Sequence, residues 1–148
     1  MAEVITDRKA EIHRAACRLF REHGFPGTSV RQIAEKVGML GGSLYSHMDS
    51  KDDLLWDIVN HAADRFLSTL ESVRTSNLGI MQKLRAAIMA HVGVITADLD
   101  AAAVYTFEWR HLAPDRRTAF TQRRDDYERS FRELVDQAIR ERYIGAES

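Results

Sequence analysis

The stretch Thr28–Lys51, with the sequence TSVRQIAEKVGMLGGSLYSHMDSK, decides the fold. It contains two short helical segments, one that begins after Thr28 or Ser29 and ends near Val37–Gly38 and one over about Gly41–Met48. Helices this short are marginal alone and depend on packing against each other and against neighbouring helices. Two of them joined by a tight turn are typical of the helix-turn-helix unit, and we therefore predict one at this position.

The geometry of that unit makes three demands on the sequence. The first helix needs a small residue at the crossing, the turn needs a residue that tolerates positive φ, and the second helix needs an apolar anchor. Ala34, Gly38 and Leu44 meet these demands in that order. The alternative from spacing alone is a plain helical hairpin, in which Gly38 caps a helix and Tyr45 packs against its neighbours.

The second short helix also has the composition of a nucleic-acid-reading element. No acidic residue, which would repel phosphates, occurs from Leu40 to Met48. Its outward residues are available to the major groove of DNA; they are Gly42, Ser43, Tyr45, Ser46 and His47. Thr28–Ser29 and Ser50–Lys51 place hydroxyls and a cation at two helix starts, where phosphates could bind.

The rest of the chain shows the helical period, because its apolar residues recur at spacings of three and four. We expect the first helix to begin at Thr6–Asp7, which supply an N-cap and a first-turn acid, and to end at Gly24. A capping pattern beginning at Ser50 opens a long helix that Thr75–Asn77 closes. Three further helices are expected, over about Leu78–Thr96, Leu99–Leu112 and Pro114 to Gly145. The sequence therefore predicts an all-α fold, with a three-helix head over residues 1–50 and a helical body over residues 51–148.

The charge and composition of the chain exclude few classes of function. The net charge is −1, but residues 1–51 hold eight Lys or Arg against six Asp or Glu, hence +2, and residues 52–148 hold thirteen against sixteen, hence −3. This asymmetry has the direction expected of a nucleic-acid-binding head. The lone Cys17 lies on an apolar helical stripe and reads as a buried, inert thiol. No apolar run approaches the roughly 18 residues of a membrane span, and no signal segment opens the chain, so we expect a cytoplasmic protein without membrane contact.

Taken as a whole, Thr28–Lys51 followed by Leu54–Leu55 closely resembles the signature of the TetR family. The preceding segment Ala16–Phe25 resembles that family's first helix and turn, so the resemblance covers about the first third of the chain. It implies a ligand-responsive repressor: a homodimer that binds a palindromic operator in double-stranded DNA and releases it when a small molecule enters the body. Residues 1–50 would then be the DNA-binding domain, and residues 51–148 the ligand-binding and dimerisation domain.

Individual functional positions of the family signature can be matched to residues of this sequence. Thr28, Ser29 and Lys51 match phosphate-contacting positions, and Arg31 is an additional candidate contact. The recognition-helix face is matched by Gly42, Ser43, Tyr45 and His47. The sequence departs from the signature at Gly41, where many members have Lys, and at Leu40, where many have a capping Ser, so base contacts are less securely assigned than phosphate contacts.

A narrower resemblance concerns the body. Met39–Tyr45, Phe107–Leu112 and Arg124–Glu128 together resemble the branch whose members respond to acyl-CoA thioesters in fatty-acid or steroid catabolism. The effector pocket would lie among the body helices, where an acyl chain could be surrounded by Met89, Val92, Tyr105, Trp109, Tyr127 and Phe131. The alternative is that these aromatic and methionine residues are plain core.

Two other functions compete with the repressor. Glu108 and His111 lie one helical turn apart, as in helical-bundle di-iron sites, but such sites need a second copy and the sequence has none. We therefore expect no enzyme, no metal and no cofactor, because no nucleophile–base pair or glycine-rich phosphate loop occurs either. The second competitor is a protein-interaction module that keeps the fold of the head but binds no DNA.

Two expectations concern the whole molecule. No flexible linker separates Met48 from Leu54, so a shift of the long helix that begins near Ser50 would move the head and change the separation of two recognition helices. Members of the family usually continue for two more helices that form most of the dimer interface. This sequence ends at Ser148, soon after Tyr143–Gly145. We therefore expect the body to lack these helices, either because the sequence is a fragment or because the protein is naturally short.

Overall fold

The computed structural model describes residues 2–145, with the side chains of residues 8–145. Within that range the chain is helical and contains no strand, which confirms the predicted all-α fold. Its elements are α1 (Ala2–His23), α2 (Val30–Lys36), α3 (Gly41–Leu44), α4 (Lys51–Arg74), α5 (Ile80–Ala97), α6 (Leu99–Phe107), the 3₁₀ turn η1 (Trp109–His111) and α7 (Pro114–Arg140).

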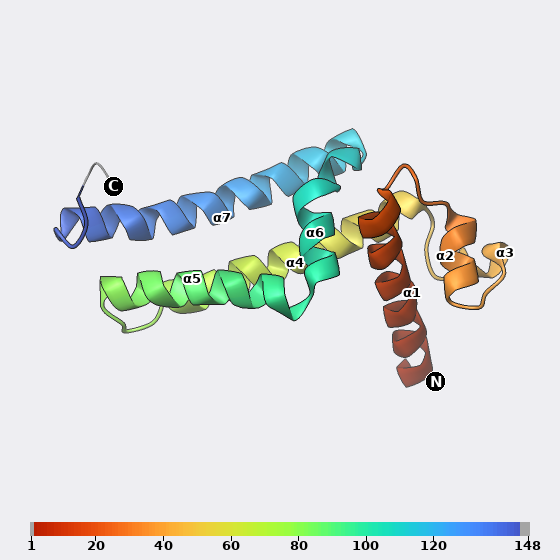
Figure 1. The fold of residues 1–148 in the computed structure, drawn as a ribbon, viewed down its shortest axis with the longest axis horizontal. Helices are drawn as coiled ribbons and strands as arrows, with labels where there is room; N and C mark the ends of the chain where they lie inside the picture. The colour runs from red at the N-terminus through yellow and green to blue at the C-terminus, as the bar shows by residue number, and fades with distance from the viewer. Residues whose placement is uncertain (1, 146–148) are drawn as a thin grey trace.

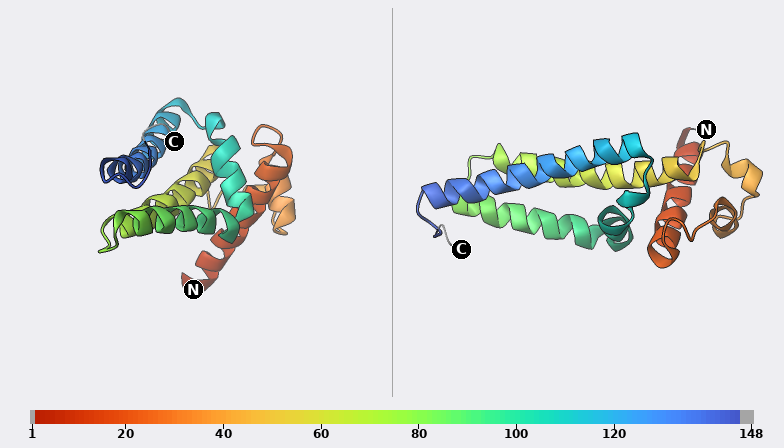
Figure 2. Two further views of the ribbon diagram at one scale, coloured as in Figure 1. Left: turned by 60° about the vertical axis from the view of Figure 1, so that its left-hand side comes forward. Right: turned by 90° about the horizontal axis from the view of Figure 1, so that it is seen from above.

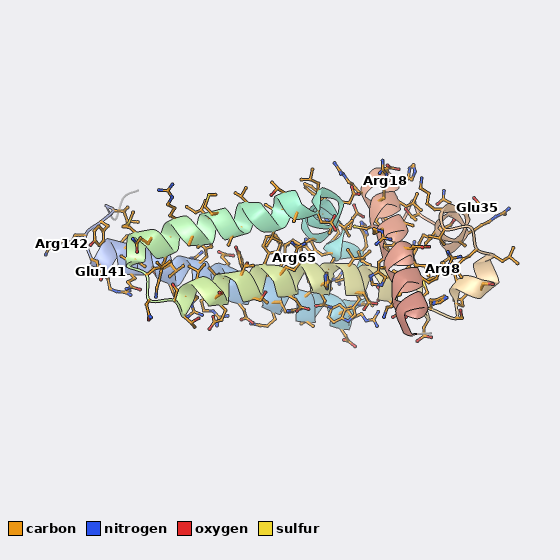
Figure 3. The ribbon with its side chains drawn as sticks, turned by 90° about the horizontal axis from the view of Figure 1, so that it is seen from below. Arg8, Arg18, Glu35, Arg65, Glu141 and Arg142 are labelled. Atoms are coloured by element: carbon orange, nitrogen blue, oxygen red, sulfur yellow. The ribbon has the colours of Figure 1, made fainter. Side chains whose placement is uncertain are left out.

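The molecule is elongated, with a small head at one end (Figure 1). Helices α4, α5 and α7 run alongside one another and form the body, while α6 crosses between the body and α1. Helix α1 lies across the long axis of the body in Figure 1 and in the right-hand view of Figure 2. Among charged side chains, Arg8, Arg18 and Glu35 lie at the head, and Glu141 and Arg142 lie at the far end of the body (Figure 3).

Two apolar clusters hold these helices together. The first joins the head to the near end of the body, because Phe20, Ile33 and Leu44 of the head share it with Val104 of α6 and Phe120 of α7. The second lies at the far end of the body, between α4, α5 and α7. Helix α4 contributes to both, so it connects the head rigidly to the body along one continuous helix.

The start of α4 has the capping box expected from the sequence. The Ser50 hydroxyl accepts from the N–H of Asp53 at 3.1 Å, and the Asp53 carboxylate accepts from the N–H of Ser50 at 3.0 Å. On the side of the body that faces α1, Asp98 ends α5 and caps α6, which is bent from α5 by 104°. No single helix in residues 2–145 is both long and apolar enough to cross a lipid bilayer; only α5 and α6 taken together across their bend pass that test.

Several expected helix limits are wrong. Helix α1 begins at Ala2, not at Thr6, because Thr and Asp can also continue a helix at modest cost. Helix α3 ends at Leu44 and continues only as turns, and α6 ends at Phe107 before the 3₁₀ turn. Helix α7 ends at Arg140, where Arg142 adopts a left-handed conformation with φ +64°. The N–H of Tyr143 then donates to the carbonyl of Ala138, which closes the helix with a Schellman motif.

Candidate functional site

Helices α2 and α3 form the predicted helix-turn-helix. Ile33, Ala34 and Leu44 are all at most 1% exposed and lie at the contact between the two helices and α1. Gly38 has φ +68°, and its N–H donates to the carbonyl of Glu35 while the N–H of Met39 donates to that of Ala34. This Schellman motif ends α2 sharply, and the positive φ explains why glycine stands there.

The outward side of α3 and the following turn is exposed. Gly42, Ser43, Tyr45 and Ser46 are exposed, and His47 is half-buried. The hydroxyl of Ser46 donates to the carbonyl of Ser43 at 2.7 Å and so holds the turn that follows the helix. An added Cβ at Gly42 would meet no atom within 4 Å, so the space in front of α3 is open to a partner.

Two further candidates lie at the edge of this surface, at the start of α2. The Ser29 hydroxyl accepts from the N–H of Gln32 at 3.1 Å, and the Gln32 side chain accepts from the N–H of Ser29 at 2.8 Å. Arg31 is exposed and donates to Glu35 at 3.2 Å, in an ion pair that water screens. The guanidinium of Arg31 is therefore free to exchange Glu35 for another anion at little cost.

Thr28 and Lys51 face the interior of the head. The hydroxyl of Thr28 donates to the carbonyls of Gly24 and Leu19 at 2.9 and 3.1 Å, and its side chain is 2% exposed. The ammonium of Lys51 donates to the carbonyls of Phe25 and Thr28 at 2.8 and 3.0 Å. Its burial lowers the pKa of Lys51. Both side chains thus hold the turn between α1 and α2, and the third Lys51 donor has no hydrogen-bond partner among the described residues.

Phe25 is the point at which the body holds this turn. Its backbone N–H donates to the carboxylate of Glu108, at the end of α6, at 2.7 Å. Its ring stacks on His111 with centroids 6.1 Å apart, and the Lys51 ammonium lies 4.1 Å from the ring centroid. The Glu108–His111 pair, which sequence reasoning considered as a metal site, therefore serves the head–body junction. In residues 8–145 no three His, Cys, Asp or Glu side chains gather as metal ligands.

The starts of α4 and α7 are joined beside the recognition surface, by which we mean the exposed side of α3 and of the turn that follows it. Asp52 accepts from the N–H of Ala113, the N-cap of α7, at 3.0 Å. The guanidinium of Arg116 lies 2.6 Å from Asp52 and 2.7 Å from Asp53, and these contacts lower the pKa of Asp53 and raise that of Arg116. None of these partners was identified from the sequence.

The body contains two adjoining cavities. The inner pocket, about 380 Å³, lies between α4, α6 and α7; its lining includes Phe66, Tyr105, Trp109, Arg124 and Tyr127. The outer groove, about 540 Å³, lies between α5 and α7; its lining includes Ile88, Val92, Phe131 and Val135. Both are lined by His91, Tyr127 and Glu128, and His91 and Tyr127 are hydrogen-bonded at 2.8 Å on the shared boundary. Burial raises the pKa of Tyr127 to about 12, so it remains a neutral hydroxyl at ordinary pH.

Five of the six predicted ligand-binding residues line these cavities. Tyr105 and Trp109 line the inner pocket, Val92 and Phe131 line the outer groove, and Tyr127 lines both. Met89 lines neither and is 64% exposed on α5. Among the lining residues that were not predicted from the sequence are Phe66, His91, Arg124 and Glu128. The spacing of Arg124, Tyr127, Glu128 and Phe131, which places them on one face of α7, is the signal that could have found two of them.

Comparison with known proteins gives family matches over most of the chain. Residues 12–58 match the family described as bacterial regulatory proteins, tetR family. Residues 78–148 match the family described as the tetracyclin repressor-like C-terminal domain.

Individual relatives agree with these matches. The chain is 32% identical over 127 residues to the HTH-type transcriptional repressor KstR2 of Rhodococcus jostii, covering 86% of this chain and 61% of that protein. The KstR2 of Mycobacterium tuberculosis is 26% identical over 97% of this chain and 72% of its own length. This chain thus spans 61% of the length of the Rhodococcus relative.

Solved structures share the fold. The crystal structure of AibR in complex with isovaleryl coenzyme A and operator DNA superposes with a TM-score of 0.83 at 26% identity, over 93% of this chain and 75% of that one. The ketosteroid transcriptional regulator KstR2 of Mycobacterium tuberculosis gives a TM-score of 0.85 at 26% identity, over 90% and 69%.

Proposed function

Because the chain belongs to the TetR family of bacterial regulatory proteins, we propose that it is a ligand-responsive transcriptional repressor that binds DNA through its head. The observation that carries this proposal is the outward surface of α3 and its following turn, which is exposed, free of acidic residues and seated on a buried apolar anchor. Such a surface can enter the major groove without repelling the phosphates on either side.

Sequence would be read from Gly42, Ser43, Tyr45 and His47. Tyr45 is the largest of these side chains and is 53% exposed, so it can present both its ring and its hydroxyl to base edges. The two glycines at the start of α3 let the backbone approach the DNA closely. At Gly41, where many family members have Lys, this chain has no cation that would add affinity for DNA. We therefore expect DNA binding by this head to depend more on Tyr45.

Phosphate contacts would come from Ser29, Arg31 and the unused donor of Lys51. Ser29 and Arg31 are exposed beside the recognition surface, and Arg31 can leave Glu35 for a phosphate at little cost. Thr28 would act mainly by positioning, because its hydroxyl is committed to two carbonyls within the head. These contacts would set register and orientation without specifying sequence.

The effector would bind in the body cavities. Their aromatic and aliphatic lining suits an acyl group, and the relative solved with isovaleryl coenzyme A supports an acyl-CoA as its class. Tyr105, Trp109, Tyr127, Val92 and Phe131 would contact the ligand directly. Met89 would contribute only if the effector extends out of the groove along α5.

Ligand and operator would communicate through α4 and α6. Both helices touch the inner pocket, through Phe66 and Tyr105, and both touch the head, through Lys51 and the Glu108 carboxylate at the end of α6. A ligand that displaces either helix would move the turn at Phe25 and with it α2 and α3. This route supports a division into a DNA-binding head, residues 1–50, and a ligand-binding and dimerisation body, residues 51–148.

We also propose the assembly and setting typical of the family: a homodimer in the cytoplasm, on a palindromic operator, with no contact to membranes. Ile88, Met89 and Val92 form an exposed apolar face on α5 that favours association. The relatives are transcriptional regulators, and we propose that this chain too acts by binding and not as an enzyme. The carboxylate of its best catalytic candidate, Glu108, is already bound to the N–H of Phe25.

The test is direct binding to DNA. Fluorescence anisotropy of the purified protein with a genomic DNA library at low salt should show binding that weakens steeply as salt rises, because phosphate contacts release counterions. Rounds of selection should then enrich a palindromic site. Absence of binding at low salt by the dimeric protein would overturn the proposal in favour of a protein-interaction module.

A further inference from the structure

Of the four arginines of α7 at positions 123 to 132, Arg124 is the one that has no carboxylate partner among the described residues. Arg123 pairs with Asp64, Arg129 with Asp126 and Arg132 with Glu128. Arg124 instead lines the inner pocket and is half-buried there. A guanidinium keeps its charge at any ordinary pH, so this pocket holds a permanent positive charge.

The guanidinium of Arg124 is held by aromatic rings. Its central carbon lies 5.1 Å from the ring centroid of Trp109 and 5.9 Å from that of Tyr105. A cation–π contact uses no N–H donor, and Arg124 donates no hydrogen bond to another of the described residues. A free N–H edge is the geometry that binds a carboxylate through two parallel hydrogen bonds.

The surroundings of Arg124 complete an anion site with an apolar extension. Two acids also line the pocket. Asp125 is exposed and makes no ion pair with Arg124 among the described residues, and Glu128 is exposed and pairs with Arg132. The hydroxyl of Tyr127 lies on the boundary between the inner pocket and the outer groove. Beyond it the groove is lined by aliphatic and aromatic side chains, which suit a hydrocarbon chain.

We propose that Arg124 binds the carboxylate of an amphiphilic ligand whose hydrocarbon chain passes the His91–Tyr127 pair and lies in the outer groove. This inference rests on the proposed function, because it names the class of effector for the same cavities. The carboxylate can belong to a free long-chain acid or to the far end of an acyl thioester that carries a second, free carboxylate. In both cases the recognised group is the same.

Binding of four probes to the full chain tests the proposal, with isothermal titration below the micelle concentration of each probe. Dodecanoate is compared with dodecan-1-ol, and the mono-CoA thioester of dodecanedioic acid with dodecanoyl-CoA. In at least one of the two pairs, the probe with a carboxylate should bind about tenfold or more tightly than the probe without it. The pair that shows this gain identifies whether the carboxylate belongs to a free acid or to an acyl thioester. Arg124→Gln should abolish that gain, whereas Arg129→Gln, on the exposed side of α7, should keep it.

Arg124→Lys distinguishes the effect of the positive charge from that of the planar guanidinium. It is also a second variant, so the test does not depend on the folding of Arg124→Gln alone. It keeps the charge but lacks the planar edge, so it should retain only part of the gain. The proposal is overturned if the carboxylate improves affinity in neither pair, or if Arg124→Gln keeps the gain. DNA binding without ligand is measured separately: a carboxylate gain in a chain that binds no DNA would sink the repressor function and leave this inference standing.

Discussion

The carboxylate of Glu108, at the end of α6, accepts a hydrogen bond of 2.7 Å from the backbone N–H of Phe25, 83 residues earlier in the chain. The carbonyl of Phe25 accepts in turn from Lys51, at the start of α4. One residue in the turn before α2 is therefore held on both sides of its backbone by the two body helices that also touch the inner pocket. This is a direct physical route between the proposed effector and the proposed recognition surface.

Removing that carboxylate should weaken the head. In Glu108→Ala the half-buried N–H of Phe25 loses its acceptor, which costs about 1–3 kcal/mol of unfolding free energy. Urea unfolding followed by far-UV circular dichroism measures this change. Asp136→Ala, an exposed acid on α7 with no bond in the described residues, serves as the control. Equal stability of the two variants would show that the Phe25–Glu108 bond contributes nothing.

Lys51→Met should affect both stability and DNA binding. The substitution keeps an aliphatic chain beside Phe25 but removes two charge-assisted hydrogen bonds, so we expect a loss of about 2 kcal/mol. If the third donor of Lys51 contacts a phosphate, the slope of log affinity against log salt should also fall by about 0.9. Lys36→Met, at the exposed end of α2, should change stability little. An unchanged unfolding midpoint for Lys51→Met would contradict the role of Lys51 in holding the turn between α1 and α2.

Two glycines near the recognition surface should respond to alanine in opposite directions. At Gly42 the added Cβ meets nothing within 4 Å, so Gly42→Ala should stabilise the head by about 0.5–1 kcal/mol through helix propensity. At Gly27 the added Cβ would lie 2.3 Å from the carbonyl oxygen of His23, so Gly27→Ala must displace the backbone and destabilise. Thermal unfolding of both variants gives the signs. The same sign for both would contradict the local geometry.

Acid should release the link between α4 and α7. The hydrogen bond from Arg116 holds the pKa of Asp53 below its ordinary value of 3.8. Well above pH 3.8, Asp53 is ionised in both the native and the unfolded chain, and the pair makes its full contribution to stability. As pH falls below 3.8 the unfolded chain takes up the proton first, and the contribution of the pair to stability is lost. Arg116→Gln should therefore lose less stability than the wild type between pH 6 and pH 3. Arg117→Gln, one residue along and without a carboxylate partner in the described residues, should behave like the wild type.

The fold could be predicted from the sequence because its determinants are local. Gly38 requires a left-handed backbone, Ser50 and Asp53 cap each other three residues apart, and Leu44 provides the anchor beneath α3. Helix ends were predicted less well, because they depend on weaker signals. The end of α7 is an example: a left-handed arginine, which sequence patterns disfavour, closes the helix where glycine would be expected.

The links between head and body could not be predicted from the sequence. The bonds Glu108–Phe25 and Asp52–Ala113 join residues 83 and 61 positions apart, and nothing in the local pattern of either partner indicates the other. Lys51 illustrates the same limit. Its resemblance to a phosphate-contacting position says nothing of the two carbonyls that it binds within the head. Long-range contacts of this kind appear only when the chain is folded.

The central claim is that the surface around Tyr45 reads DNA sequence, and one measurement tests it most directly. Anisotropy gives the ratio of affinities for a selected palindromic site and a scrambled duplex at one salt concentration. Tyr45→Ala should reduce that ratio about tenfold, the loss of one good base contact. Tyr143→Ala removes another exposed tyrosine, at the far end of the body, and should leave the ratio unchanged. Full sequence preference in Tyr45→Ala, or none in the wild type, would contradict the account.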